Sequence, residues 1–169
     1  NGSNVLVKDG GFRGVVVRMG REFGKIERTD DGLYAQAGAL MSLLSKAALD
    51  AGLTGLEFAQ GIPGTVGGGI YMNAGAYGGE MSQVVKYVRL FDGKRIRNMP
   101  VEEMQFGYRH SLAMEEKAVV LGAAFRLEKG NPAEIQEKMQ DFAQRRRSKQ
   151  PLEYPSAGSF FKRPTGYFA

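Results

Sequence analysis

The sequence contains no cysteine and only one histidine. Without cysteine the chain can form no disulfide and offers no thiolate nucleophile, and this composition fits a reducing compartment. With His110 as the sole imidazole, neither a histidine-based metal site nor a serine–histidine–aspartate triad is expected. These absences exclude several of the commonest kinds of catalytic centre.

Long hydrophobic runs are also missing. The longest apolar stretch, residues 118–125, has eight residues, which suits a buried strand and is too short to span a bilayer. No stretch at the start of the chain has the pattern of a secretory signal peptide. We therefore expect no membrane partner.

What is present is the composition of a soluble globular protein. The 169 residues are 43% hydrophobic and 24% charged, enough for one domain with a core and part of a second. The net charge of +5 favours an anionic partner, either nucleic acid or a phosphorylated small molecule. Apart from 145–149 the basic residues are spread along the chain, so a dedicated nucleic-acid-binding module is disfavoured.

Hydrophobic alternation and turn signals predict several strands. Short buried strands are expected over 4–7 and 15–17, on either side of the turn Asp9-Gly10-Gly11. Two hairpins are expected, 22–27 with 33–36 and 84–91 with 94–98, closed by Asp30-Asp31-Gly32 and by Asp92-Gly93 respectively. A further strand is predicted over 119–127.

Two helices follow from apolar spacing and capping residues. One spans about 40–48 and ends before Gly52. The other starts at Asn131, with Pro132 in its first turn and Ile135, Met139 and Phe142 on one face. The chain is therefore predicted to be α+β, with a domain boundary near Gly130 that separates residues 1–130 from 131–169.

The segment 61–79, GIPGTVGGGIYMNAGAYGG, holds eight glycines in nineteen positions. That is too much glycine for a packed helix or strand, and the segment is too apolar for a flexible linker. We expect a backbone whose amides approach a flat or polyanionic ligand, with a tightly packed loop without ligand as the alternative. Neither the P-loop nor the Rossmann pattern is present. Asn73 is a polar residue in an apolar neighbourhood and must find a partner.

Three further groups could carry chemistry, and each has a plainer alternative. Gly2-Ser3-Asn4 could bind a phosphate or form a simple turn. Arg109 could clamp a carboxylate or lie on the surface. Ser159, followed by two phenylalanines and two cations, could donate a proton if a cation stabilised its alkoxide, or it could be an ordinary loop serine.

Taken together, the motifs resemble the UDP-N-acetylenolpyruvoylglucosamine reductase (MurB) family of peptidoglycan synthesis. The matching segments span nearly the whole chain in the family's order: GSNVLVKDGGFRGVVV, GLEFAQGIPGTVGGGIYMNAGAYGGE, FGYRHS and PSAGSFFKRP. GIPGTVGG followed by NAGAYG is highly specific, and LEYPSAGSFFKRP is typical of the shorter, second subtype.

The resemblance implies an FAD-binding domain of the vanillyl-alcohol oxidase (PCMH) type, followed by the start of a smaller α+β substrate domain. It implies a cytoplasmic enzyme that uses FAD and NADPH to reduce UDP-N-acetylglucosamine enolpyruvate to UDP-N-acetylmuramate. Arg109 matches the arginine that stabilises negative charge on the substrate, and Ser159 matches the proton donor. Substrate contacts are implied for Tyr108, Lys162 and Arg163, although some members have asparagine at the last position. Cofactor contacts are implied for Gly2, Ser3, Asn4, Gly61, Pro63, Gly64, Thr65, Gly67, Gly68, Asn73, Ala74 and Gly75.

The chain departs from the family at its ends. Members have a further sheet-forming segment before GSN, and after the region of Ala169 they have more substrate domain with a catalytic glutamate. The resemblance therefore implies a central piece of a longer enzyme that is not catalytically competent alone. Another FAD-dependent oxidoreductase of the same fold, and a basic nucleotide- or nucleic-acid-binding module, are the alternatives.

Overall fold

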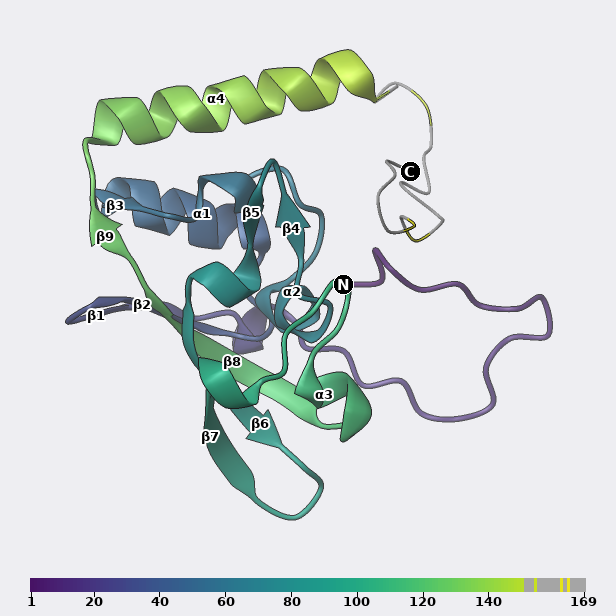
Figure 1. Ribbon diagram of the computed structural model, residues 1–169. Coiled ribbons are helices and arrows are strands. Elements are labelled where there is room, and N and C mark those ends of the chain that lie inside the picture. The colour runs from purple at the N-terminus through teal and green to yellow at the C-terminus, as the bar shows by residue number, and fades with distance from the viewer. Residues whose placement is uncertain (151–153, 155–161, 163, 165–169) are drawn as a thin grey trace.

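A five-stranded antiparallel sheet forms the centre of the molecule (Figure 1). The computed structural model describes residues 1–150, 154, 162 and 164. The strand order is β1-β2-β8-β6-β7, so the late strand β8 lies in the middle, between two hairpins. The strands are β1 (Ile26–Thr29), β2 (Gly32–Gln36), β6 (Val85–Phe91), β7 (Ile96–Pro100) and β8 (Val119–Arg126).

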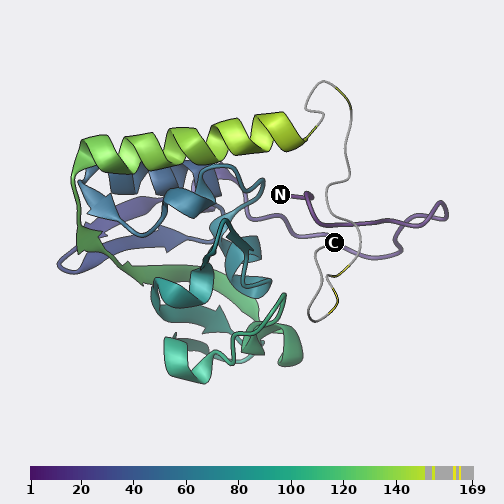
Figure 2. The ribbon, with the colours of Figure 1, turned by 45° about the horizontal axis from the view of Figure 1, so that its top comes forward.

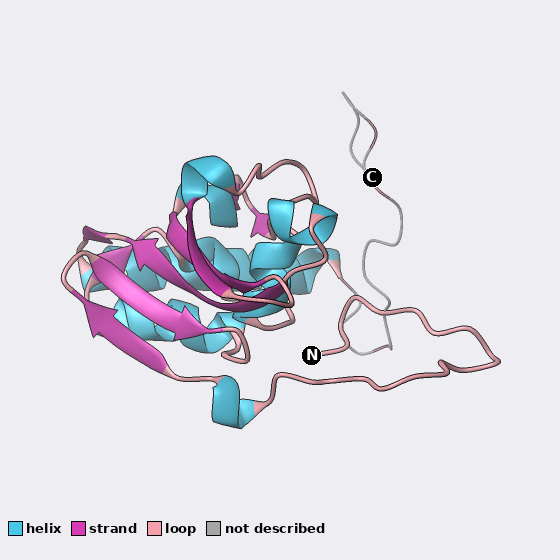
Figure 3. Ribbon diagram, turned by 90° about the horizontal axis from the view of Figure 1, so that it is seen from below, coloured by secondary structure: helices cyan, strands magenta, loops and turns pink. Residues whose placement is uncertain are grey.

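Helices and two short ladders complete the described part of the chain (Figures 1 and 3). The helices are α1 (Met41–Asp50), α2 (Val66–Tyr71), α3 (Leu112–Glu115) and α4 (Pro132–Lys149). The ladders pair β3 (Leu53–Thr54) with β9 (Glu128–Lys129), and β4 (Gly75–Ala76) with β5 (Gly79–Glu80). The 3-10 turns are η1 (Arg21–Phe23), η2 (Glu57–Ala59), η3 (Met81–Gln83) and η4 (Val101–Glu103).

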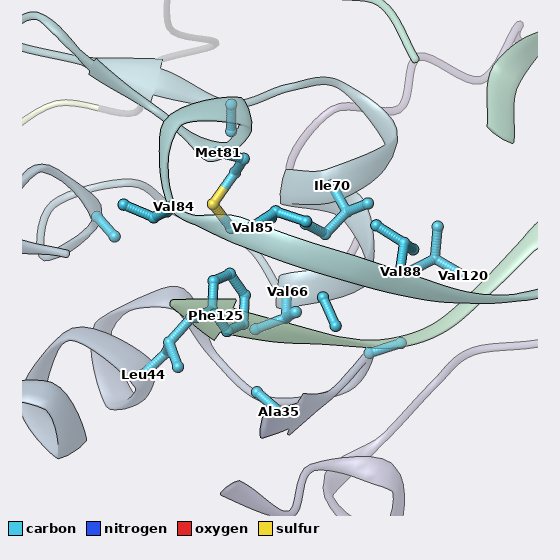
Figure 4. Packing of buried hydrophobic residues seen from close by; sticks show 14 of the residues in the cluster. Ala35, Leu44, Val66, Ile70, Met81, Val84, Val85, Val88, Val120 and Phe125 are labelled. Atoms are coloured by element: carbon cyan, nitrogen blue, oxygen red, sulfur yellow. The ribbon is translucent and has the colours of Figure 1, made fainter. Parts of the chain in front are cut away.

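The core lies between the sheet and the helices. Val66 and Ile70 of α2 pack with Val88 of β6 and Phe125 of β8, and all four are fully buried. Leu44 of α1 joins the same cluster. Figure 4 shows these side chains gathered where the four elements meet. The short helix α2 is therefore held by the core, so the position of the glycine-rich segment is fixed by apolar burial.

The two predicted hairpins are confirmed. β1 and β2 pair from Ile26 opposite Ala35 to Thr29 opposite Gly32, and β6 pairs with β7. In the second turn Gly93 has a φ of 93°, which glycine tolerates. An Asp92 carboxylate oxygen accepts hydrogen bonds from two following backbone amides, at 2.9 Å each. The first hairpin starts later than predicted, because residues 21–23 form η1.

The predicted helices and the central strand are also confirmed. α1 is followed by Gly52 in the left-handed region, at φ 65°. α4 begins as expected, since Asn131 Oδ1 accepts a hydrogen bond from the Ala133 amide at 3.0 Å. Its residues Ile135 and Met139 are buried. α4, which follows residue 130, packs on α1 and η2, which precede it. The domain boundary near residue 130 stays a prediction.

The prediction of buried strands over 4–7 and 15–17 is wrong. These residues form no strand, and Leu6 and Val15 are 82% and 87% exposed. Figures 1 and 2 show residues 1–18 as an extended loop away from the sheet. A short apolar run needs a facing strand or sheet to be stable, and sequence alternation does not say whether one is at hand. The turn between them is present, with the Gly11 amide donating to the Lys8 carbonyl at 2.8 Å.

The expectation that segment 61–79 holds no packed helix is wrong as well. Residues 66–71 form α2, and the reason lies in the space around its glycines. A Cβ atom at Gly67 would lie 2.8 Å from the Ala37 Cβ, and one at Gly69 would lie 2.9 Å from the Met41 sulfur. The missing side chains let α2 approach its neighbours closely, and this packing outweighs a helix-propensity cost of about 1 kcal/mol per glycine.

Candidate functional site

The structure brings the start of the chain to the glycine-rich segment. Ser3 Oγ donates a hydrogen bond to the Pro63 carbonyl at 3.1 Å, although the two residues are sixty positions apart. Gly64 follows with a φ of 138°, and a Cβ there would lie 3.3 Å from Ser3 Oγ. Gly2 and Asn4, on either side of the serine, are exposed. The predicted phosphate contact at Gly2-Ser3-Asn4 thus lies beside the segment 61–79, whose backbone is predicted to approach a flat or polyanionic ligand.

The first two backbone amides of α2 already donate hydrogen bonds within the protein and are not free to bind a ligand. The Val66 amide donates to the Ala39 carbonyl at 2.8 Å, and the Gly67 amide donates to the Ala37 carbonyl at 2.9 Å. Thr65, before them, is buried. Gly68 is exposed, and a Cβ there would meet only Thr65 Oγ1, at 3.9 Å. A flat ligand could therefore approach the backbone at Gly68 without meeting a side chain.

Gly61 faces α4. A Cβ on this glycine would lie 2.6 Å from the Nε of Arg146. Within the described residues, that Nε and Gln60 Oε1 are buried without a hydrogen-bond partner. Arg146 belongs to the basic run 145–149, and charge patterning alone cannot show that a glycine in another segment makes room for it.

A pocket of about 280 Å³ lies at the other end of α2. Its lining includes four of the residues assigned to the site from the sequence, Asn73, Gly75, Tyr108 and Arg109. Two segments about thirty positions apart in the chain form it. Sequence reasoning did not find Tyr77, Glu80 and Gln83, which also line the pocket. Tyr77 and Glu80 lie in the β4–β5 hairpin and Gln83 lies in η3, and only the fold shows that they face the same pocket.

The β4–β5 hairpin forms one wall of this pocket. Its two central residues, Tyr77 and Gly78, have φ values of 54° and 84°, as a type I′ turn requires. The Tyr77 ring stacks on Phe142 of α4, with a centroid distance of 4.7 Å and an interplanar angle of 10°. The hairpin is thereby attached to α4.

A tight turn at residues 107–110 forms the opposite wall. Gly107 and His110 exchange two backbone hydrogen bonds of 3.2 Å, which leaves Tyr108 and Arg109 at the tip. The guanidinium of Arg109 lies over the Tyr108 ring, 5.3 Å from its centroid, and it forms no salt bridge with a carboxylate among the described residues. His110 instead pairs with Glu115, at 3.1 Å. The pocket therefore presents a cation that can receive an anionic group.

Glu57, just before the glycine-rich segment, links it to α4. Its side chain is buried and accepts hydrogen bonds from Thr54 Oγ1 at 2.6 Å and from the Gly55 amide at 2.9 Å. Lys138 of α4 lies 3.9 Å away. Burial raises the pKa of Glu57, but the hydrogen bonds and the lysine outweigh it, and the pKa lies below its usual value of 4.5.

The other residues assigned to the site from the sequence do not line the pocket or lie outside the described part of the chain. Ala74 is buried at the end of α2, next to the pocket residue Asn73. Lys162 is exposed, and Ser159 and Arg163 lie outside the described residues. No group of three or more acidic, histidine or cysteine side chains within residues 1–150 could hold a metal ion. None of the helices in that same range is long and apolar enough to cross a membrane.

Known proteins resemble this chain along its whole length. It is 53% identical over 170 residues to a UDP-N-acetylenolpyruvoylglucosamine reductase of Clostridium perfringens, and 49% identical over 171 residues to one of Staphylococcus aureus. Each match covers all of this chain, but only 56% and 55% of the relative. The chain thus spans little more than half the length of the curated relatives it matches. These matches confirm the resemblance drawn from the motifs.

The fold is similarly matched. The crystal structure of a UDP-N-acetylenolpyruvylglucosamine reductase from Thermus caldophilus superposes with a TM-score of 0.87 at 36% identity, covering 99% of this chain and 61% of the other. The family described as the FAD binding domain matches residues 1–95. The predicted FAD-binding fold of the PCMH type is therefore confirmed. The chain belongs to the FAD-binding-domain family.

Proposed function

We propose that this chain is the FAD-binding part of a reductase that uses NADPH to convert UDP-N-acetylglucosamine enolpyruvate to UDP-N-acetylmuramate in the cytoplasm. The observation that carries the proposal is the grouping of assigned residues at both ends of α2. Ser3 meets Pro63 at one end, and Arg109 shares a pocket with Asn73 and Gly75 at the other. The 53% identity to a reductase of this name supports the same activity.

The residues present fit a flavin cofactor. At Gly68 an added Cβ would meet only Thr65 Oγ1, at 3.9 Å, and at Gly64 only the Ser3 hydroxyl, at 3.3 Å, so little side-chain bulk covers this backbone surface. A Cβ at Gly64 would crowd that hydroxyl, so glycine keeps the surface open. FAD held along this surface would supply the hydride for the reaction. The protein's part is to bind and orient the reactants and to manage the charge and the proton.

Arg109 would manage the charge. Hydride addition to the methylene carbon of an enolpyruvyl group, whose double bond is conjugated to a carboxylate, leaves an enolate-like dianion. A guanidinium already in place at the pocket wall stabilises such charge without reorganisation during the reaction. Tyr108 lies beneath this guanidinium and would contact the substrate with Lys162 and Arg163.

Ser159 would deliver the proton to the adjacent carbon, since the enolate must be protonated to complete the reduction. A nearby cation would stabilise the resulting alkoxide, and in the sequence Lys162 and Arg163 follow Ser159 after two phenylalanines. This role rests on the resemblance of PSAGSFFKRP, which lies largely outside the described residues.

The test uses the FAD-loaded, full-length protein that contains this chain, in anaerobic stopped-flow experiments. Ser159→Ala and Arg109→Ala should leave flavin reduction by NADPH nearly intact. Reoxidation by the enolpyruvyl substrate should slow by roughly 10²–10³-fold. Equal slowing of both half-reactions would contradict these roles. A colourless wild-type protein that is retained on nucleic acid would refute the proposed function itself.

A further inference from the structure

The turn that carries Arg109 is tethered at both of its ends to α2. Asn73 Nδ2 donates a hydrogen bond to the Gly107 carbonyl at 3.1 Å. Ser111 Oγ donates one to the Tyr71 carbonyl at 2.8 Å. Asn73 and Ser111 are 2% and 0% exposed, and both bonds are partly buried. Loss of either bond would leave buried polar groups unpaired, which makes the two tethers strong constraints.

The backbone explains why position 73 can hold an asparagine. The Asn73 amide donates to the Ile70 carbonyl at 3.1 Å and the Ala74 amide donates to the Gly69 carbonyl at 2.8 Å, so α2 ends in a Schellman motif. The residue after the last cap must then be left-handed, and Asn73 has a φ of 42°. Glycine is usual there and asparagine is the common alternative. Asparagine keeps the backbone geometry and adds a side chain that can reach other segments.

The side-chain amide of Asn73 joins three segments of the chain. Its Oδ1 accepts a hydrogen bond from the Ser82 amide in η3 at 3.0 Å, while its Nδ2 holds Gly107. Through Gly107 it sets the position of the turn, whose tip residue Arg109 is left-handed at φ 56°. Residues other than glycine rarely adopt this conformation, and it persists only where surrounding contacts hold it.

We propose that Asn73 and Ser111 are positioning residues that hold the Arg109 turn in place for the reduction of the substrate. This rests on the proposed function, because it takes the role of Arg109 from there. Both polar groups of the Asn73 side chain already bond to backbone partners, so we assign it to the Arg109 turn and not to direct cofactor contact. The two tethers prevent the turn from moving away from the pocket, and small displacements of a charged group are costly in catalysis.

The variants separate the tether from the backbone geometry. Asn73→Gly keeps the left-handed position and removes both side-chain bonds. Asn73→Asp keeps the acceptor for the Ser82 amide and removes the donor to Gly107. Ser111→Ala removes the other tether. Thr54→Val is the matched control, because it removes a hydrogen bond to Glu57 in a different part of the fold.

The first readout is amide hydrogen exchange, measured in the protein without cofactor. Asn73→Gly and Asn73→Asp should speed exchange of the His110 amide, which donates to the Gly107 carbonyl, by roughly 10-fold or more. Exchange of Leu44 in α1 should stay unchanged, and Thr54→Val should leave His110 as in the wild type. Unchanged His110 exchange in both Asn73 variants would overturn the tether.

The second readout is a double-mutant cycle with Arg109→Ala in the FAD-loaded, full-length protein. Each Asn73 variant should slow reoxidation by the substrate roughly 10–100-fold, leave reduction by NADPH within about twofold, and have little further effect when Arg109 is already alanine. Equal slowing in both backgrounds would refute the positioning role. If Arg109→Ala alone left reoxidation unchanged, the proposed function of Arg109 would fail, while the hydrogen-exchange result would still judge the tether.

Discussion

Two adjacent glycines of α2 should respond to the same substitution with opposite signs. Gly67 and Gly68 lie next to each other in one helix, so replacing either by alanine brings a similar gain in helix propensity, about 0.8–1 kcal/mol. Their surroundings differ. A Cβ at Gly67 would lie 2.8 Å from the Ala37 Cβ and 3.2 Å from the Ala37 carbonyl oxygen, whereas one at Gly68 would meet only Thr65 Oγ1, at 3.9 Å.

The magnitudes follow from these distances. Gly68→Ala keeps the propensity gain and should raise the free energy of unfolding by about 0.5–1 kcal/mol. Gly67→Ala forces α2 away from the backbone after β2, and overpacking of this kind costs about 1–3 kcal/mol. The net change for Gly67→Ala is a loss of roughly 0–2 kcal/mol. The two variants should therefore differ by about 1–3 kcal/mol, or at least roughly 2 °C in Tm for a domain of this size.

Urea and thermal unfolding of the cofactor-free, full-length protein, followed by circular dichroism, measures this difference. The m-value should stay the same, so that the midpoints report stability alone. If Gly67→Ala stabilises the protein as much as Gly68→Ala, the argument that glycine permits close packing of α2 is wrong. The proposed function adds an independent expectation, since Gly68→Ala should retain FAD less well in spite of its greater stability.

Three further outcomes are expected elsewhere in the fold. Folding lowers the pKa of Glu57, so the stability that its carboxylate contributes is complete above about pH 4.5 and is lost as the pH falls through the folded-state pKa. The urea midpoint of Glu57→Gln should therefore change less than that of the wild type between pH 6 and pH 3.5. Phe142→Leu removes the stack on Tyr77 and should cost about 0.5–1.5 kcal/mol beyond lost area, whereas the exposed Gln144→Ala on the same helix should be near neutral; equal Tm values for the two would contradict this. Gly32 has a φ of 153°, and an added Cβ there would overlap the carbonyl oxygen of Phe125 in β8, so Gly32→Ala should prevent β2 from pairing normally with β8. An unchanged Tm for this variant would show that β2 can shift to make room.

Local signals predicted much of the fold correctly. Asp92 and Gly93 form the predicted turn because the carboxylate accepts from backbone amides only two and three residues ahead. Asn131 and Pro132 start α4 for the same local reason. The residues of the site were named from motifs, and the structure brings Ser3 to Pro63, and Asn73 to the turn of Arg109. The cofactor and substrate contacts of these residues stay predictions.

The sequence by itself determined turns, caps, helix faces and membership of an FAD-binding family, because each depends on residues close together in the chain or on a specific motif. Only the tertiary structure decided which apolar runs find a partner, so Leu6 and Val15 are exposed while Val66 is buried. It also decided that glycine builds a packed helix here. Propensity is a property of one residue, but the gain from close approach depends on atoms such as those of Ala37, which come from a distant segment.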